Sequence, residues 1–217
     1  METAAEKQEQ KSDLGNALID SNRVMNFSDA IFAFAATLLV LKIDLPVLDG
    51  VDINTALPGA LINLWPQYLA NIITFFVIGH YWLEHHAIFS KIKRYNSILV
   101  WLNIILLISV AFLPFPVDLY GDHYNVPFVV AFYSGALAIV GLLNLIIWVY
   151  ASSGRRLIDN NMSQEKITHF TIKASISPIG FGLAVPPSFI HPLVAQFSWA
   201  FLILGIILVN KLYKFRN

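Results

Sequence analysis

Long stretches without a charged side chain limit the fold of this chain more than any other feature. No Asp, Glu, Lys or Arg occurs between Leu61 and Leu83. A helix needs about 20 apolar residues to cross the hydrocarbon core of a bilayer, which is about 30 Å thick. Only 13% of the residues are charged and 57% are hydrophobic, whereas soluble domains carry roughly a quarter charged residues. The sequence therefore predicts an integral membrane protein.

Six segments are long and apolar enough to span a membrane. We expect transmembrane helices at about residues 25–45, 60–89, 97–113 and 126–151, and two more between Lys166 and Lys211. The prolines of LPFPVD are expected to end the third helix, and PPSFIHP at 186–192 to separate the fifth from the sixth. The predicted fold class is an all-α integral membrane protein with six transmembrane helices. Residues 1–22 form an N-terminal tail in this interpretation, and residues 23–217 form one domain of six transmembrane helices.

The basic residues predict the orientation of these helices. With six spans, both termini and the loops after spans two and four lie on one side. That side carries twelve of the fourteen basic residues: Lys7, Lys11, Arg23, Lys91, Lys93, Arg94, Arg155, Arg156, Lys166, Lys211, Lys214 and Arg216. The opposite loops carry acidic residues: Asp44, Asp49, Asp52, Asp118 and Asp122. The positive-inside rule then places both termini in the cytoplasm of a multi-pass protein of the plasma membrane.

Composition also argues against several functions. The formal net charge is zero, so we expect no nucleic-acid partner. The chain has no cysteine, which removes thiol catalysis and Cys-ligated zinc. No Ser, His and Asp occur in the local context of a nucleophilic site. We therefore expect neither an enzyme nor a bound cofactor or metal, and a lipid bilayer as the surrounding partner.

The first expected helix, NFSDAIFAFAATLLVLKID, has distinct faces. At 100° per residue one stripe contains Ile31, Phe34, Leu38, Leu41 and Leu45, with Thr37 at its edge. Alanines 30, 33 and 36 form a ridge of small residues that allows another helix to approach closely. Two interpretations remain open here. The helix is either a buried element of the bundle core, or the lining of a pore in which bulky apolar rings gate by dewetting.

Ionisable residues inside a span usually face the protein interior with a partner. Asp29 and Arg23 point about 120° apart on a helix, so we expect each to find a partner on another helix, with Ser28 adding a hydroxyl bond. Candidates in the second span are His80, Trp82, Glu84, His85 and His86. The i, i+4 pair of His80 and Glu84 is open to three interpretations: an interhelical hydrogen-bonding role, a proton relay, or a metal site.

These residues also carry a family resemblance. RVMNFSD resembles the R-x-x-x-F-S-D signature of the transmembrane protein 175 family, and the similarity continues through AIFAFAATLLVLKIDLP and YWLEHHAIF. It covers essentially the whole chain and points to a bacterial member with one repeat. The resemblance implies a potassium-permeable cation channel. It further implies a homotetramer whose first helix lines a central pore, without the P-loop filter of ordinary potassium channels. The chain contains no TVGYG-like stretch.

Carried onto this sequence, the resemblance places the pore constriction on the first helix. The pore residues implied are Ile31, Phe34, Thr37, Leu38 and Leu41, with potassium passing near the last four. The family usually has Ile or Leu where this chain has Phe34. The resemblance also implies a polar network that holds the first helix against the second: Arg23, Phe27, Ser28, Asp29, Trp82, His85 and His86.

Two functional hypotheses follow from the sequence. The first is a passive tetrameric channel for monovalent cations. The second is a proton-coupled secondary transporter that uses Asp29 and the histidines of the second span. Transporters typically contain inverted repeats and broken helices near the membrane midplane. The first span has neither Gly nor Pro between Asn26 and Leu45, which favours the channel.

Overall fold

The computed structural model describes residues 21–44, 46, 48, 50, 52–197 and 199. Its helices, in chain order, are α2 (Ser21–Leu38), η1 (Leu39–Lys42), α3 (Ile53–Asn63), α4 (Trp65–Phe89), α5 (Ser97–Phe112), α6 (Pro114–His123), α7 (Pro127–Ser152), η2 (Ser153–Arg155) and α8 (Gln164–Ser188). The all-helical fold expected from the sequence is confirmed for this part of the chain. Ser21, the first described residue, already lies in a helix, although the tail is expected to extend to residue 22.

Several of these helices are long and apolar enough to cross a membrane. Within the part of the chain that the structure describes, three stretches qualify outright, at Ser21–Lys42, Ser97–His123 and Pro127–Arg155. The pair α3 and α4 qualifies together but is bent by 45° between its halves. These four match the first four expected spans in order, and α8 occupies the place of the fifth. The expected sixth span lies almost wholly outside the described residues, as do Leu45, Asp49 and the basic C-terminus, so a count of six stays a prediction.

Helix α5 ends at Phe112, so the break expected at the LPFPVD prolines is confirmed. The apolar stretch itself reaches further than expected, because α6 starts at Pro114 and continues the same candidate span to His123. Proline is tolerated in the first turn of a helix because the N–H that it lacks has no partner there. Pro186 and Pro187 lie within the last turn of α8. The helix ends at Ser188, within the break expected at residues 186–192.

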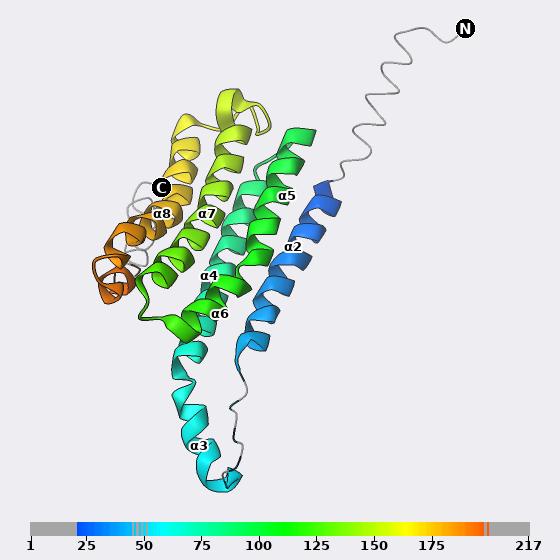
Figure 1. Cartoon of the computed structure of the whole chain (residues 1–217). Helices are drawn as coiled ribbons and strands as arrows, with labels where there is room; N and C mark the ends of the chain where they lie inside the picture. Colours follow the sequence, from blue (N-terminus) through cyan, green and yellow to red (C-terminus); the bar gives the residue numbers. More distant parts are fainter. Residues whose placement is uncertain are drawn as a thin grey trace.

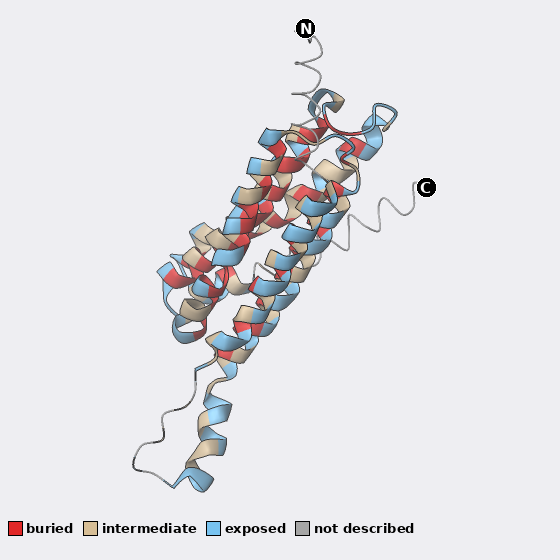
Figure 2. Cartoon of the chain, turned by 90° about the vertical axis from the view of Figure 1, so that its right-hand side faces the viewer, coloured by how far each residue is buried: buried red, intermediate tan, exposed pale blue. Residues whose placement is uncertain are grey.

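The helices are arranged as a bundle with α2 at one edge and α8 at the other (Figure 1). Helix α2 packs against α4 and α5, whereas α7 packs along α8. Helix α3 extends beyond one end of the bundle (Figure 1). Buried residues lie between the helices, and the outward faces are mostly exposed (Figure 2). Exposed positions include many large apolar side chains, as expected for surfaces that meet lipid or another subunit.

Two of the largest buried side chains, Trp148 and Tyr81, have hydrogen-bond partners that join neighbouring helices. The Trp148 indole N–H donates to Thr171 Oγ1 over 2.9 Å, which joins α7 to α8. The Tyr81 hydroxyl donates to the carbonyl of Leu137 over 2.7 Å, which joins α4 to α7. Because an unpaired buried polar group is unfavourable, these bonds select one register between neighbouring helices.

The loops after α4 and after α7 meet at the end of the bundle where α2 begins (Figure 1). The backbone N–H of Lys93 donates to the carbonyl of Leu157 over 2.8 Å, and the Arg94 guanidinium donates to the carbonyl of Arg155 over 2.9 Å. Two of the expected basic loops therefore share one end of the molecule.

Candidate functional site

Helix α2 is divided lengthwise into a packed face and an exposed face. Its buried residues are Ser28, Phe32 and Ala35, and Leu39 continues this face in η1. They recur every three or four residues, so they form one stripe of a helix with 3.6 residues per turn. The stripe packs into the bundle, and the small Ser28 and Ala35 allow close approach of the neighbouring helices.

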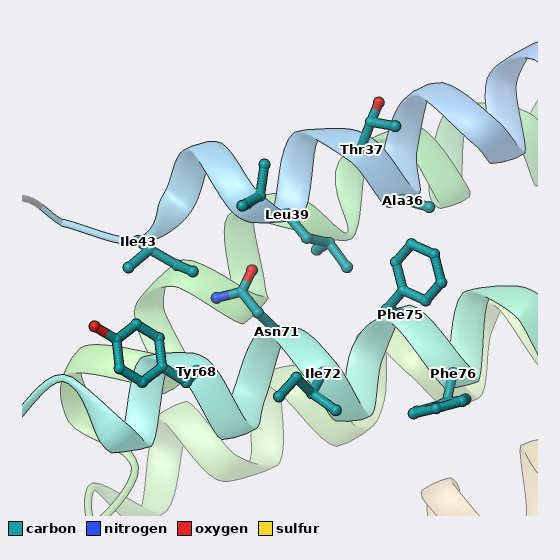
Figure 3. A pocket seen from close by; sticks show the side chains of 10 residues that line it. Ala36, Thr37, Leu39, Ile43, Tyr68, Asn71, Ile72, Phe75 and Phe76 are labelled. Atoms are coloured by element: carbon teal, nitrogen blue, oxygen red, sulfur yellow. The ribbon is translucent and has the colours of Figure 1, made fainter. Parts of the chain in front are cut away.

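The opposite face of α2 and η1 is apolar and exposed. Phe34 is 57% exposed and Leu41 is 75% exposed. Thr37 is also exposed, and its hydroxyl donates to the carbonyl of Phe34 over 2.8 Å. The oxygen of Thr37 points away from α4 (Figure 3) and keeps its lone pairs for another partner. Among the expected pore residues, Phe34, Thr37 and Leu41 lie on this exposed face.

The other two expected pore residues lie at its edge. Ile31 and Leu38 are half-buried, and Ile31 packs against the hydrophobic core. Leu45, which the periodicity places on the same stripe, lies outside the described residues. The exposed face is therefore narrower than the stripe expected from the sequence.

Asp29 of α2 contacts α4, the second expected span. The contact lies toward the end of the bundle where the basic loops meet. The indole N–H of Trp82 donates to Asp29 Oδ1 over 2.8 Å. His86 Nδ1 lies 3.9 Å from the same oxygen, and the rings of Trp82 and His86 are 5.5 Å apart. The Asp29 carboxylate thus connects α2 to one face of α4, with a charge-assisted hydrogen bond from the indole.

A second, buried chain of hydrogen bonds joins α2 to two helices at once. Asn103 of α5 donates from Nδ2 to Ser28 Oγ over 2.9 Å, and its Oδ1 lies 2.8 Å from His85 Nε2. The amide oxygen only accepts, so His85 carries its proton on Nε2 in this arrangement. The Ser28 hydroxyl in turn donates to the carbonyl of Val24 over 2.8 Å. These hydrogen bonds connect α2, α4 and α5.

Asn103 was missed by the sequence analysis, although one signal was available. It is the only amide side chain in the apolar α5 segment SILVWLNIILLISVAF, and it is only 2% exposed. A polar residue in the middle of a membrane span indicates an interhelical contact. Two residues expected in the network do not join it. Arg23 and Phe27 are exposed on α2, and within the described residues Arg23 makes no hydrogen bond or ion pair.

The far end of the first helix is also held by polar contacts. Lys42 Nζ lies 3.2 Å from Asp118 Oδ2 on α6. Gln67 of α4 accepts from the Asp44 backbone N–H over 3.0 Å, and its own amide donates to Asp44 Oδ2 over 3.3 Å and to Asp122 Oδ1 over 2.7 Å. The Gln67 side chain therefore joins the segment after η1 to both α4 and α6.

Between these two attachments, apolar clefts separate α2 from α4 (Figure 3). One cleft of about 620 Å³ contains Leu39, Asn71 and Phe75 in its lining, and a second of about 420 Å³ extends toward Trp82. The two clefts share Ala36 and Phe75. The first helix is thus bound to α4 at both ends and loosely packed against it in the middle.

Comparison with known proteins adds to this geometry. The family described as "Endosomal/lysosomal potassium channel TMEM175" matches residues 23–114. A potassium channel of Streptomyces collinus is 30% identical over 179 residues, which cover 79% of this chain and 84% of that protein. A potassium channel of Chamaesiphon minutus is 31% identical over 174 residues, covering 79% and 85% respectively.

The chain belongs to the TMEM175 family. A crystal structure described as a lysosomal potassium-selective channel TMEM175 homolog from Chamaesiphon minutus superposes with a TM-score of 0.75 and 28% sequence identity. The match covers 88% of this chain and 98% of that one. The match at residues 23–114 includes α2, α4 and α5, the three TMEM175 helices that the Asp29 and Asn103 contacts connect.

Proposed function

We propose that this TMEM175-family chain forms a homotetrameric, potassium-permeable cation channel in which the exposed face of α2 lines a central pore. The observation that carries the proposal is this face itself. It presents Phe34, Thr37 and Leu41 outward from a helix whose other face is fixed by buried and polar contacts. Relatives with similar sequences are potassium channels. Multi-pass insertion in the plasma membrane, with cytoplasmic termini, belongs to the same proposal.

In this channel Phe34 forms the constriction. Four phenyl rings around a symmetry axis exclude water from a narrow passage, and a dry passage is a barrier to ions because they lose hydration there. Thr37, one turn further along the helix, supplies hydroxyl oxygens that partly replace this hydration. Leu38 and Leu41 continue the apolar wall. The pore contains no P-loop filter, so selectivity for potassium rests on its lower dehydration penalty relative to sodium.

The attachments of α2 give this pore a means of opening. The hydrogen bonds of Asp29 and Ser28 hold one end, and the contacts of Asp44 and Lys42 hold the other. The apolar clefts against α4 leave the middle of α2 room to shift. A small rotation of α2 would move the Phe34 ring out of the axis while both ends stay attached.

The test is ion flux into liposomes that contain the purified protein. We expect passive potassium flux that exceeds sodium flux and needs no proton gradient. Phe34→Ala should raise the flux several-fold because it removes the constriction. Phe128→Ala is the matched control, since Phe128 is similarly exposed at 64% but lies on α7. Unchanged flux in Phe34→Ala would contradict the gate, and flux that requires a proton gradient would favour the transporter that uses Asp29 and the α4 histidines.

A further inference from the structure

A second polar cluster lies between α4 and α8, on the side of α4 away from the Asp29 contact. Glu84 is only 6% exposed, and its Oε1 lies 3.3 Å from His80 Nε2. The same nitrogen lies 3.2 Å from Ser177 Oγ on α8. The other oxygen of Glu84, Oε2, is buried and has no hydrogen-bond partner within the described residues. The pore proposal does not use any of these groups.

Asn144 of α7 is unpaired in the same way. It is completely buried, and neither atom of its amide has a hydrogen-bond partner among the described residues. Its height in the bundle follows from Gly141, whose added Cβ would lie 3.3 Å from Ser177 Cβ. Helices α4 and α7 run in the same direction (Figure 1). His80 and Gly141 both lie beside Ser177. Glu84 is one turn after His80 on α4, and Asn144 is about one turn after Gly141 on α7, so the two residues lie at about the same level of the bundle.

Helix α8 contributes two further groups at this level. It runs opposite to α4 and α7 (Figure 1), so the residues one turn before Ser177 lie beside Glu84. Pro178 has no N–H, and the carbonyl of Ala174 therefore lacks its ordinary donor four residues later. Lys173 is half-buried and lies on the same face of α8 as Ser177, four residues away. No ion pair between Lys173 and Glu84 occurs in the described structure.

Glu84 Oε2 therefore lacks a hydrogen-bond donor within the described residues. A buried carboxylate oxygen without a partner is strongly unfavourable, and so is a buried amide without one. A proton on Glu84 Oε2 removes the charge and creates an O–H donor for a neighbouring acceptor. We propose that Glu84, with His80 and Ser177, forms a proton-binding site in the wall of each subunit, separate from the α2 pore face.

Other titratable groups lie on the helices around this site and contribute to the response of the protein to pH. On α4 they are His80, Tyr81 and His85; on α7, Tyr133; on α8, Lys173 and His169; and on α2, Asp29, which binds the opposite face of α4. Lysine and tyrosine ordinarily titrate near pH 10, and aspartate near pH 4. Histidine ordinarily titrates between about pH 5 and about pH 8, so the Glu84→Gln variant is needed to distinguish a proton on Glu84 from one on the neighbouring histidines.

Infrared difference spectroscopy on the full-length protein in lipid tests the proposal directly. Acidification from about pH 8 to about pH 5 should produce the C=O stretching band of a protonated carboxyl group. Glu84→Gln keeps the shape of the side chain and should remove this band. Glu165→Gln, at an exposed position in the first turn of α8, is the matched control and should keep it. A band that persists in Glu84→Gln overturns the proposal, as does a band that responds to potassium rather than to pH.

A second measurement uses the unaltered protein. Dicyclohexylcarbodiimide is apolar and reacts with protonated carboxyl groups, so mass spectrometry should find Glu84 labelled increasingly as the pH falls. Labelling that is absent at Glu84 or independent of pH contradicts the site. An effect of this proton on ion flux rests on the proposed channel function. We expect the pH midpoint of flux to shift by more than about one unit in Glu84→Gln. The spectra do not depend on flux, so failure of the channel and failure of the proton site are distinguishable.

Discussion

Asn103→Leu is expected to destabilise the protein through hydrogen bonds that only the tertiary structure creates. Leucine has a similar volume and keeps the apolar packing of α5. The substitution removes the acceptor of His85 Nε2–H and the donor to Ser28 Oγ, which lie 2.8 and 2.9 Å from the Asn103 amide. His85 is completely buried, so water cannot replace the lost acceptor.

The expected magnitude follows from these two losses. A buried donor left without an acceptor costs about 1–3 kcal/mol. Ser28 keeps its own bond to Val24, so its oxygen adds less. A total of about 2 kcal/mol lowers the Tm of a chain of this size by about 4–8 °C. Thermal unfolding of the purified protein, followed by size-exclusion chromatography, measures this shift.

Two further variants make the reasoning refutable. Ser109→Ala is a control on the same helix, because Ser109 is partly exposed and bonds only to the carbonyl of Ile105; it should change stability by less than about 0.5 kcal/mol. His85→Phe combined with Asn103→Leu should cost less than the sum of the single variants, since both partners become apolar. A Tm for Asn103→Leu equal to that of Ser109→Ala, or strict additivity in the double variant, would refute the argument.

Two more predictions concern the helix contacts. Asp29→Ala removes the acceptor of the Trp82 indole; because the carboxylate is 39% exposed, we expect a loss of about 1 kcal/mol, measured as a lower Tm and a smaller tetramer fraction by size-exclusion chromatography. A variant with normal Tm, assembly and flux would contradict the anchoring role. Gly141→Ala places a Cβ 2.9 Å from a proline ring of α8 and should cost about 1–3 kcal/mol in unfolding experiments. Gly135→Ala, whose Cβ would have nothing within 4 Å, should be neutral or stabilising, and equal effects of the two variants would rule out steric overlap as the cause.

The sequence predicted the helices better than it predicted their contacts. The first four spans were located from apolar length, because hydrocarbon leaves the backbone no partner outside a helix. The break at the LPFPVD prolines was predicted correctly, but the continuation of the span in α6 was not, since prolines at the start of a helix lack an N–H that has no partner there. Trp82, which hydrogen-bonds to Asp29, was among the partners expected for this ionisable residue on the second span.

Helical periodicity was also a partial guide to the candidate pore face. It placed Phe34, Thr37 and Leu41 together on one stripe, and these three are exposed. Ile31 and Leu38 share the stripe but are half-buried, because the width of the exposed face depends on how closely α4 and α5 approach α2. Periodicity reports directions around one helix and contains no information on the neighbouring helices.

The sequence by itself determined that this chain is a membrane protein, approximately where its helices lie, and which family it belongs to. These properties follow from local composition and from short motifs such as RVMNFSD. Only the tertiary structure decided that Asn103 joins Ser28 to His85, and that Glu84 Oε2 and the Asn144 amide are buried without a hydrogen-bond partner among the described residues. These relations join residues up to 75 positions apart. They depend on the rotation and register of packed helices, which side-chain packing and the pairing of buried polar groups set together.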